Sequence, residues 1–238
     1  EEIFRWSDEN KTTPKTSAPS MTEAMEVMKP FLDEGREIIC FSISDSMSTS
    51  GNVMRLAAED LEASDRVTVI NSANLSTGIG LQVIQAAILS AEGKTRAQIT
   101  AAIEEIRPRV RASFVVDTLT YLYRGGRCNA VAALAGGMLK LHPRIVVEDG
   151  AMDASKKYRG KLASVILSYT KDMEEALKNA VPDRVFITHS GCDREIVESV
   201  RSYLESLGIF NEILETRAGG VVSSHCGPGT LGVLFIEK

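Results

Sequence analysis

The segment EIICFSIS at residues 37–44 decides the fold class of this chain. Its apolar run is typical of a buried strand, and RVTVINS at residues 66–72 has the same character. Between the two lie a serine-rich loop and a helix expected at residues 52–61. Strand, loop and helix repeated in this order predict a parallel sheet covered by helices. Such sheets place ligands at the carboxyl ends of their strands.

Helix boundaries in the first half of the chain carry clear capping signals. Ser20 and Glu23 have the capping-box spacing and precede an apolar stripe that stops at Gly35. Thr95 and Gln98 repeat this spacing for a helix that we expect to run to about residue 106. The apolar residues between 80 and 91 also have helical spacing. These helices are expected to cover the parallel sheet.

The second half alternates less regularly. We expect a hairpin through the turn at residues 148–150, and one long helix from there to about residue 179. The other expected strands are 113–116, 184–189, 211–216 and 231–237, and the other expected helices are 117–123, 129–139 and 193–207. The sequence therefore predicts an α/β protein of two lobes, with a parallel sheet in residues 1–112 and a mixed α/β arrangement in residues 113–238.

Composition excludes several classes of protein. The 27 Lys and Arg residues are outnumbered by 32 Asp and Glu, which argues against a nucleic-acid partner. No apolar run approaches the roughly 20 residues that span a bilayer, so we expect a cytoplasmic protein without stable membrane insertion. The four cysteines are scattered, and three histidines offer no metal-type spacing, so neither a disulfide framework nor a metal site is expected. Because residue 1 is Glu, we expect the natural start to be missing.

Two hydroxyl-rich segments flank predicted elements. The first, TSAPS at residues 16–20, precedes a helix, and capping accounts for Ser20 but not for Thr16 and Ser17. The second, SISDSMSTSG at residues 42–51, follows a strand. One hydroxyl there must cap the next helix, yet a single cap does not need six hydroxyls. Both segments are therefore candidates for anion binding.

Three further segments have both functional and structural interpretations. STGIG at residues 76–80 could cradle a phosphate, but it lacks the Lys and the glycine spacing of a P-loop. GGR at residues 125–127 allows close backbone approach and supplies Arg127, although a helix C-cap would explain its glycines equally well. HCGPGT at residues 225–230 is a tight turn that carries His225 directly before the last expected strand.

Taken together, these segments resemble the DegV family in order and spacing. The resemblance is carried by Thr16-Ser17-x-Pro19-Ser20, Ser44 to Ser48, Ile70-Asn71-Ser72 with Gly78 and Gly80, Tyr121-Leu122-x-x-Gly125-Gly126-Arg127, Leu141-x-Pro143, Asp149-Gly150, Lys157-x-Arg159 and His225-x-Gly227-Pro228-Gly229-x-Leu231-Gly232.

The resemblance implies a non-catalytic carrier that holds a long-chain fatty acid in a tunnel between two lobes. It implies that Thr16, Ser48 and His225 bind the carboxylate, and that Ser17, Ser46 and Arg127 contact the head group or a partner. It also implies a separate ATP-dependent fatty-acid kinase that converts the bound carboxylate to an acyl phosphate for phospholipid synthesis. No cofactor is implied.

The serine-rich loop departs from the family pattern. Where the family continues from the binding serine as Ser-Gly-Thr, this chain has Ser48-Thr49-Ser50-Gly51, so Ser46 or Ser50 could take the role of Ser48.

Two other functions compete with the carrier. A serine hydrolase would use Ser48 as nucleophile, His225 as base and Asp45 to orient the imidazole, but Ser48 lacks a G-x-S-x-G elbow. A nucleotide- or sugar-phosphate-binding enzyme would use the loop at residues 76–80 and a helix N-terminus. It would leave the other hydroxyl clusters without a role.

Overall fold

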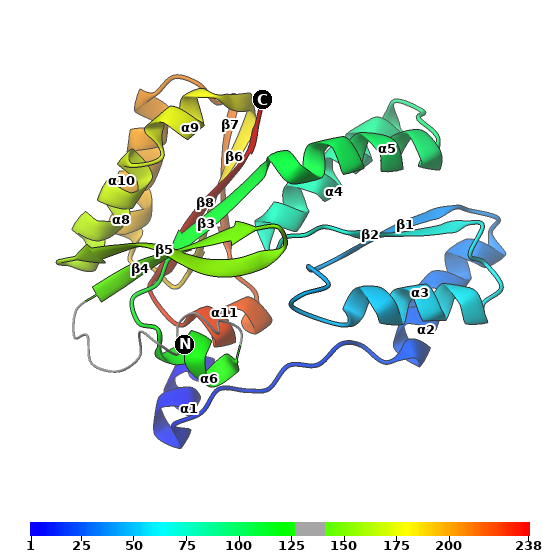
Figure 1. Cartoon of the computed structure of the whole chain (residues 1–238), viewed down its shortest axis with the longest axis horizontal. Helices are drawn as coiled ribbons and strands as arrows, with labels where there is room; N and C mark the ends of the chain where they lie inside the picture. The colour runs from blue at the N-terminus through cyan, green and yellow to red at the C-terminus, as the bar shows by residue number, and fades with distance from the viewer. Residues whose placement is uncertain (127–140) are drawn as a thin grey trace. The chain divides into compact units, whose positions relative to one another are not determined.

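A computed structural model describes residues 1–126 and 141–238 (Figure 1). Its contacts form two compact units: unit 1 comprises Glu1–Thr16, Arg111–Glu148 and Met152–Lys238, and unit 2 comprises Ser17–Val110 and Asp149–Ala151. The division into lobes at residue 112 stays a prediction. By contact, the first sixteen residues are grouped with the second half of the chain, and a three-residue turn of the second half is grouped with the first. The helix predicted at residues 129–139 lies outside the described residues.

Unit 2 contains a two-stranded parallel sheet with helices packed against it. The strands pair from Ile38 with Val67 to Ser42 with Asn71. Its elements are α2 (Met21–Asp33), β1 (Ile38–Ser42), α3 (Ser50–Asp60), β2 (Val67–Asn71), α4 (Thr77–Ala91), α5 (Arg96–Ile106) and the 3-10 turn η1 (Arg107–Arg109).

The strand β1 is apolar from Ile38 to Phe41, and helices cover both of its faces. Ile38 and Cys40 pack into a cluster with residues of α2 and α3. The alternate residues Ile39 and Phe41 pack into a second cluster with residues of α4 and α5. Figure 1 shows the two helix pairs on opposite sides of the strands. A strand buried on both faces has no polar alternation, which explains the continuous apolar run at residues 38–41.

The capping signals of the sequence are present in unit 2. Ser20 accepts a hydrogen bond from the Glu23 amide, and the Glu23 side chain accepts one from the Ser20 amide. Thr95 and Gln98 form the same reciprocal pair at the start of α5. Each capping box satisfies amides that the first helical turn leaves without a partner.

Unit 1 is built on a mixed six-stranded sheet in the order β5-β4-β3-β8-β6-β7. β3 runs antiparallel to β4, β6 antiparallel to β8, and β6 parallel to β7. Its elements are α1 (Glu2–Asn10), β3 (Val110–Val115), α6 (Thr120–Gly125), β4 (Leu141–Glu148), β5 (Ala151–Arg159), α8 (Leu162–Lys171), α9 (Glu174–Lys178), β6 (Ala180–Ser190), α10 (Arg194–Ser206), β7 (Glu212–Arg217), α11 (Gly220–Cys226) and β8 (Thr230–Glu237). With its helix-flanked parallel and mixed sheets, the chain has the predicted α/β fold class.

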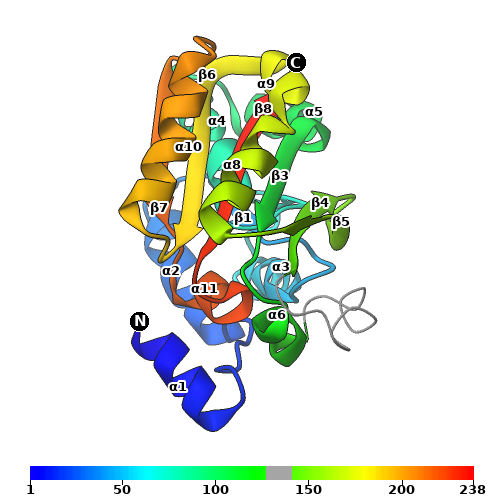
Figure 2. The same cartoon turned by 90° about the vertical axis from the view of Figure 1, so that its left-hand side faces the viewer.

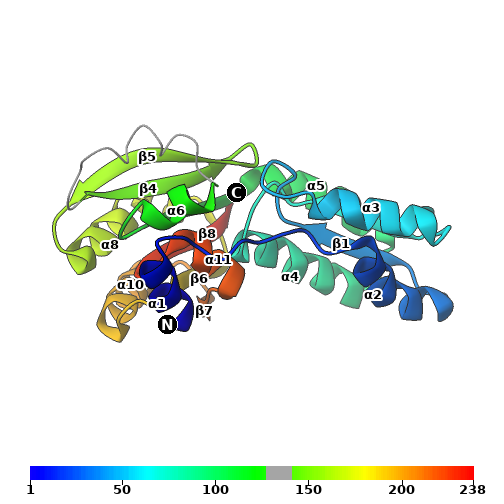
Figure 3. The ribbon, with the colours of Figure 1, turned by 90° about the horizontal axis from the view of Figure 1, so that it is seen from below.

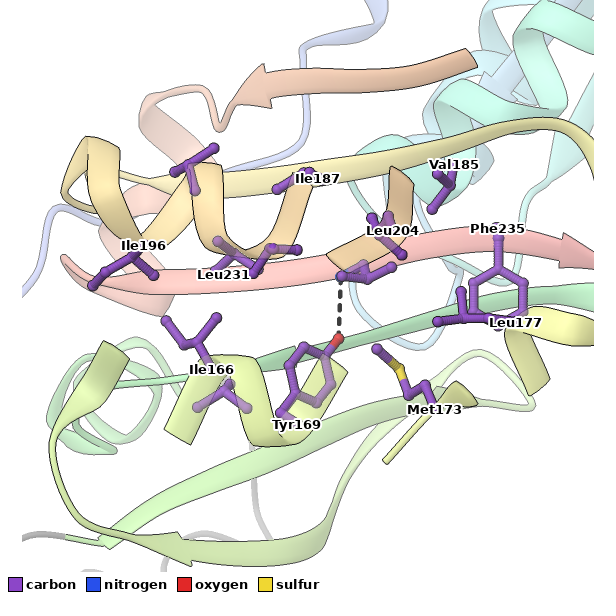
Figure 4. Close-up of a cluster of buried hydrophobic side chains, with 14 of the residues drawn as sticks. Ile166, Tyr169, Met173, Leu177, Val185, Ile187, Ile196, Leu204, Leu231 and Phe235 are labelled. Atoms are coloured by element: carbon purple, nitrogen blue, oxygen red, sulfur yellow. Dashed lines mark hydrogen bonds between the residues drawn. The ribbon is translucent and has the colours of Figure 1, made fainter. Parts of the chain in front are cut away.

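The core of unit 1 lies between this sheet and the helices α8 and α10, which are side by side in Figure 2. Tyr169 of α8 is fully buried and reaches the two central strands (Figure 4). Its hydroxyl donates to the Ser113 carbonyl at 2.7 Å and accepts from the Val233 amide at 3.1 Å. One phenol therefore joins a helix to β3 and β8 while every polar group involved keeps a partner.

The structure differs from the sequence-based expectation at three helices. The single helix expected up to residue 179 is divided into α8 and α9, and the division coincides with Asp172, whose carboxylate accepts a hydrogen bond from Tyr158 of β5. The helices α1 and α11 were not expected. Gly219 and Gly220 give α11 a poor intrinsic start, and its residues 223–226 are buried by tertiary packing instead.

Candidate functional site

Thr16 and His225 are 209 residues apart in sequence and meet in unit 1. Thr16 Oγ1 lies 2.9 Å from His225 Nε2. Thr16 is half-buried, and His225 is only 9% exposed. His225 lies in the last turn of α11, and the Gly-Pro-Gly turn begins two residues later. The ring is therefore carried by a helix rather than by the tight turn that the sequence predicts.

Two glycines allow α6 and α11 to pack closely enough to hold this ring. A Cβ atom at Gly125 of α6 would lie 2.2 Å from His225 Nδ1. A Cβ atom at Gly227, just after α11, would lie 2.5 Å from Cδ2 of Tyr121 on α6. Each helix thus presents a glycine to the ring of the other, and a side chain at either position would push the helices apart.

The helix α1 contacts α11 and is hydrogen-bonded to α6, and the three helices α1, α6 and α11 lie together in Figure 3. The Tyr121 hydroxyl donates to Asp8 Oδ1 at 3.0 Å, and Arg124 donates to the Ser7 carbonyl at 3.2 Å. Burial and the hydrogen bond to Asp8 raise the pKa of Tyr121 to about 12, so the phenol stays protonated and donating. Phe4 also packs edge-on against the Tyr121 ring. Because Thr16 follows α1 in the sequence, the contacts between α1 and α6 help to place Thr16 next to His225.

Ser48 lies in unit 2, directly before α3. Its hydroxyl accepts a hydrogen bond from the Ser50 amide at 3.2 Å and lies 2.8 Å from Ser50 Oγ. Thr49 is the N-cap residue of α3, yet its side chain makes no capping bond. Ser48 therefore accepts a hydrogen bond from the amide of Ser50, the first residue of α3. When Ser50 Oγ donates to it as well, both lone pairs of Ser48 are used and its own proton is available to a ligand.

The other serines of this loop are engaged with a backbone carbonyl. Ser44 Oγ donates to the Gly150 carbonyl at 2.6 Å, and Ser46 Oγ donates to the same oxygen at 2.5 Å. A serine hydroxyl has a single proton, so these two protons are committed within the protein. Of the serines considered for the carboxylate, Ser46 is thus tied to Gly150, and Ser50 is paired with Ser48.

The remaining predicted site residues have simpler descriptions. Ser17 is exposed and follows Thr16 at the start of unit 2. Arg127 lies outside the described residues. Their contacts with a head group or partner stay predictions.

Two features of the structure weigh against the competing functions. Next to the loop considered for phosphate at residues 76–80, Asn74 Oδ1 accepts from the Leu75 amide at 3.0 Å and lies only 1.9 Å from where a Cβ atom of Gly78 would stand. The Asn74 side chain thus occupies the space beside Gly78 of that loop. In the triad considered for a hydrolase, Nε2 of the proposed base lies against Thr16, and Asp45 forms an ion pair with Arg55 at 3.0 Å.

The described residues 1–126 and 141–238 meet the requirements of neither a metal site nor a membrane-spanning helix. In that part of the chain, no group of three or more His, Cys, Asp or Glu side chains could hold a metal ion. The helices of the same residues also include none with the length and apolar character needed to cross a membrane.

Sequence reasoning missed the residues that support the site. Asp8 and Tyr121 are hydrogen-bonded although they are 113 positions apart. A contact over this sequence distance leaves no local pattern from which it could be predicted. The Asp149-Gly150 turn was identified as a hairpin, but nothing in the local sequence indicates that its carbonyl receives two serine hydroxyls from residues more than a hundred positions earlier.

Comparison with known structures gives the same fold. A DegV family protein from Thermus thermophilus, described for its fatty acid binding, superposes with a TM-score of 0.90 at 29% identity, covering 100% of this chain and 84% of that one. A stearic-acid-binding protein from Eubacterium ventriosum superposes with a TM-score of 0.81 at 26% identity, covering 100% of this chain and 83% of that one.

Sequence comparison identifies the family. A DegV domain-containing protein from Deinococcus radiodurans is 33% identical over 227 residues, which are 94% of this chain and 78% of the relative. Another, from Caldanaerobacter subterraneus subsp. tengcongensis, is 30% identical over 240 residues, covering 100% of this chain and 84% of the relative. The family model described as "Uncharacterised protein, DegV family" matches residues 1–238. The chain therefore belongs to the DegV family.

Proposed function

We propose that this chain binds a long-chain fatty acid and acts as a carrier rather than as an enzyme. The observation that carries the proposal is the Thr16–His225 hydrogen bond. It brings together two residues that the family resemblance assigns to the carboxylate. The relatives from Thermus thermophilus and Eubacterium ventriosum, both described as fatty-acid-binding, support the choice of ligand.

The chemistry of the pair depends on which atom donates the proton. If His225 Nε2 carries hydrogen, it donates to Thr16 Oγ1, and the threonine proton is then available to a carboxylate oxygen. The opposite tautomer would consume the threonine proton inside the protein. We therefore assign His225 as the donor to Thr16, so that the imidazole orients the hydroxyl that meets the ligand.

We assign Ser48 as a second hydroxyl donor to the same carboxylate. Its oxygen is supported by the Ser50 amide, which leaves its proton for the ligand when Ser50 Oγ also donates. A carboxylate is an acceptor with two oxygens, so it matches two hydroxyl donors. Ser17 and Arg127 are proposed to contact the head group or a partner. The contact proposed earlier for Ser46 would require its hydroxyl to leave Gly150.

The acyl chain and the hydroxyls have different energetic roles. Burying a tail of about 15 methylenes gains on the order of 10 kcal/mol before the entropy costs of binding, at about 0.8 kcal/mol each. Two hydrogen bonds to a charged carboxylate add about 2–5 kcal/mol together. The tail therefore sets affinity, and the hydroxyls set the position of the carboxylate.

The biological role that we propose is presentation of the carboxylate to an ATP-dependent fatty-acid kinase in the cytoplasm. That kinase would transfer the γ-phosphoryl group of ATP to a carboxylate oxygen, giving an acyl phosphate and ADP, and the acyl phosphate would feed phospholipid synthesis. A head group held by neutral hydroxyls keeps its negative charge and nucleophilic oxygen. This suits presentation better than hydrolysis.

Mass spectrometry of the denatured, as-purified protein tests the ligand class. A stoichiometric long-chain fatty acid is the expected result. A nucleotide or sugar phosphate in its place would support the phosphate-binding alternative. Turnover of a generic ester that Ser48→Ala abolishes would support the hydrolase and overturn the carrier.

A further inference from the structure

The turn between β4 and β5 holds the serine-rich loop of unit 2. We propose that Gly150 and Ser44 are positioning residues for the Ser48 hydroxyl, an inference that rests on the fatty-acid-binding function proposed above. The Gly150 carbonyl and the Ser44 backbone form a continuous path of hydrogen bonds that ends at Ser48. Neither residue touches the ligand in this scheme.

The geometry of the turn requires glycine at position 150. β4 ends at Glu148 and β5 begins at Ala151, so Asp149 and Gly150 form a two-residue loop. Their φ angles are 49° and 78°, which is the pair of positive values typical of a type I′ hairpin turn. A Cβ atom on Gly150 would also lie 2.6 Å from Ser44 Oγ. The absence of a side chain therefore permits both the turn and its close approach to the serine loop.

Ser44 is the centre of the path because each of its polar groups is engaged. Its amide donates to the Asn74 carbonyl at 2.9 Å, and its hydroxyl donates to the Gly150 carbonyl at 2.6 Å. Its own carbonyl accepts from the amides of Met47 at 2.9 Å and Ser48 at 3.2 Å. Ser44 is 2% exposed, so water does not readily replace these partners.

Ser46 strengthens the same attachment. It donates to Gly150 at 2.5 Å, and its oxygen lies 3.1 Å from Ser44 Oγ. The Gly150 carbonyl thus receives two hydroxyls from the turn that leads to Ser48. Removing both donors would free the loop at its point of attachment while leaving Ser48 itself unchanged. Among these three serines of the loop, Ser44 and Ser46 therefore anchor it, and Ser48 is the one proposed to bind the carboxylate.

The test combines the double substitution Ser44→Ala/Ser46→Ala with Ser48→Ala. Palmitate affinity is measured by calorimetry on delipidated protein for the wild type, both variants and their combination. Ser42→Ala is the matched control, because Ser42 is equally buried in the same segment but donates to the Ile70 carbonyl instead of Gly150. We expect the anchor variant to weaken palmitate binding about five- to tenfold when Ser48 is present. The loss should fall below about twofold in the Ser48→Ala background, since coupled residues are not additive.

Equal losses in both backgrounds, or no loss in the first, would overturn the positioning role. A second measurement does not depend on the ligand: amide hydrogen exchange of Met47 and Ser48 followed by NMR. Exchange should become about tenfold faster in the anchor variant and stay unchanged in Ser42→Ala. Unchanged exchange in the anchor variant would also overturn the inference. If the wild type binds no palmitate, the proposed function fails, and the exchange rates still decide whether Gly150 and Ser44 position Ser48.

Discussion

Replacing Thr16 by valine removes one hydroxyl while nearly preserving the shape of the side chain. That hydroxyl lies 2.9 Å from His225 Nε2 and is assigned to the carboxylate. A hydrogen bond to a charged group contributes about 1.5–3 kcal/mol, so the dissociation constant for palmitate should rise roughly ten- to a hundredfold. Thr16→Ser keeps the hydroxyl, and its dissociation constant should stay within about threefold of the wild type.

Calorimetry with delipidated protein measures this effect, and a thermal melt separates binding from stability. His225 loses the Thr16 partner of its Nε2 in the valine variant, so a cost of about 1 kcal/mol and a melting temperature lower by about 2–4 °C are expected. Thr22→Val, which also removes a threonine hydroxyl but at an exposed position without a proposed role in binding, serves as the control. Wild-type palmitate affinity in the Thr16→Val protein, with or without the expected drop in melting temperature, would refute the assignment of Thr16.

Three further predictions concern transfer, stability and pH. His225→Gln keeps a donor for Thr16 and should retain fatty acid. It should nevertheless slow acyl phosphate formation with a fatty-acid kinase and ATP, because an amide, unlike an imidazole, cannot take up or release a proton as the charge of the head group changes. A normal melt with wild-type formation would remove His225 from transfer. Tyr169→Phe should lower the free energy of unfolding in urea by about 2–4 kcal/mol, because its two buried backbone partners each lose a hydrogen bond; a loss below about 0.5 kcal/mol would contradict the bridging role. For Glu215, burial alone would raise the carboxyl pKa, but the hydrogen bond from Arg201 and the charge of Arg194 hold that pKa below its usual 4.5. Glu215 thus contributes stability above pH 4.5 that is lost as pH falls through its lowered pKa, and Glu215→Gln should show a smaller loss of unfolding free energy over that acid range.

The sequence predicts the elements of unit 2 well because the deciding interactions are local. The capping boxes at Ser20 and Thr95 involve residues three positions apart, and both predicted boxes are present in the structure. The apolar run of β1 reflects burial on two faces, which a single strand displays in its own composition. Residue propensity and hydrophobic periodicity therefore suffice to predict a helix or strand when the residues that decide it are close together in the sequence.

The support of the site could not be predicted because it depends on long-range contacts. His225 reads as part of a tight turn, yet it lies in a helix that Gly125 and Tyr121 help to stabilise from a distant segment. Ser46 and Ser48 look equivalent in a serine-rich run. The Gly150 carbonyl, more than a hundred residues away, distinguishes them. Such distinctions follow from tertiary structure, which overrides local propensity.

Titration of the delipidated protein with palmitate and with methyl palmitate tests the central claim most directly. The two ligands share the same tail, but the ester lacks the charged carboxylate that Thr16 and Ser48 are proposed to receive. The account predicts saturable palmitate binding at one site, and binding of the ester weaker by roughly tenfold or more, because charge-assisted hydrogen bonds are lost. Absence of palmitate binding, or equal affinity for the acid and its ester, would contradict the account.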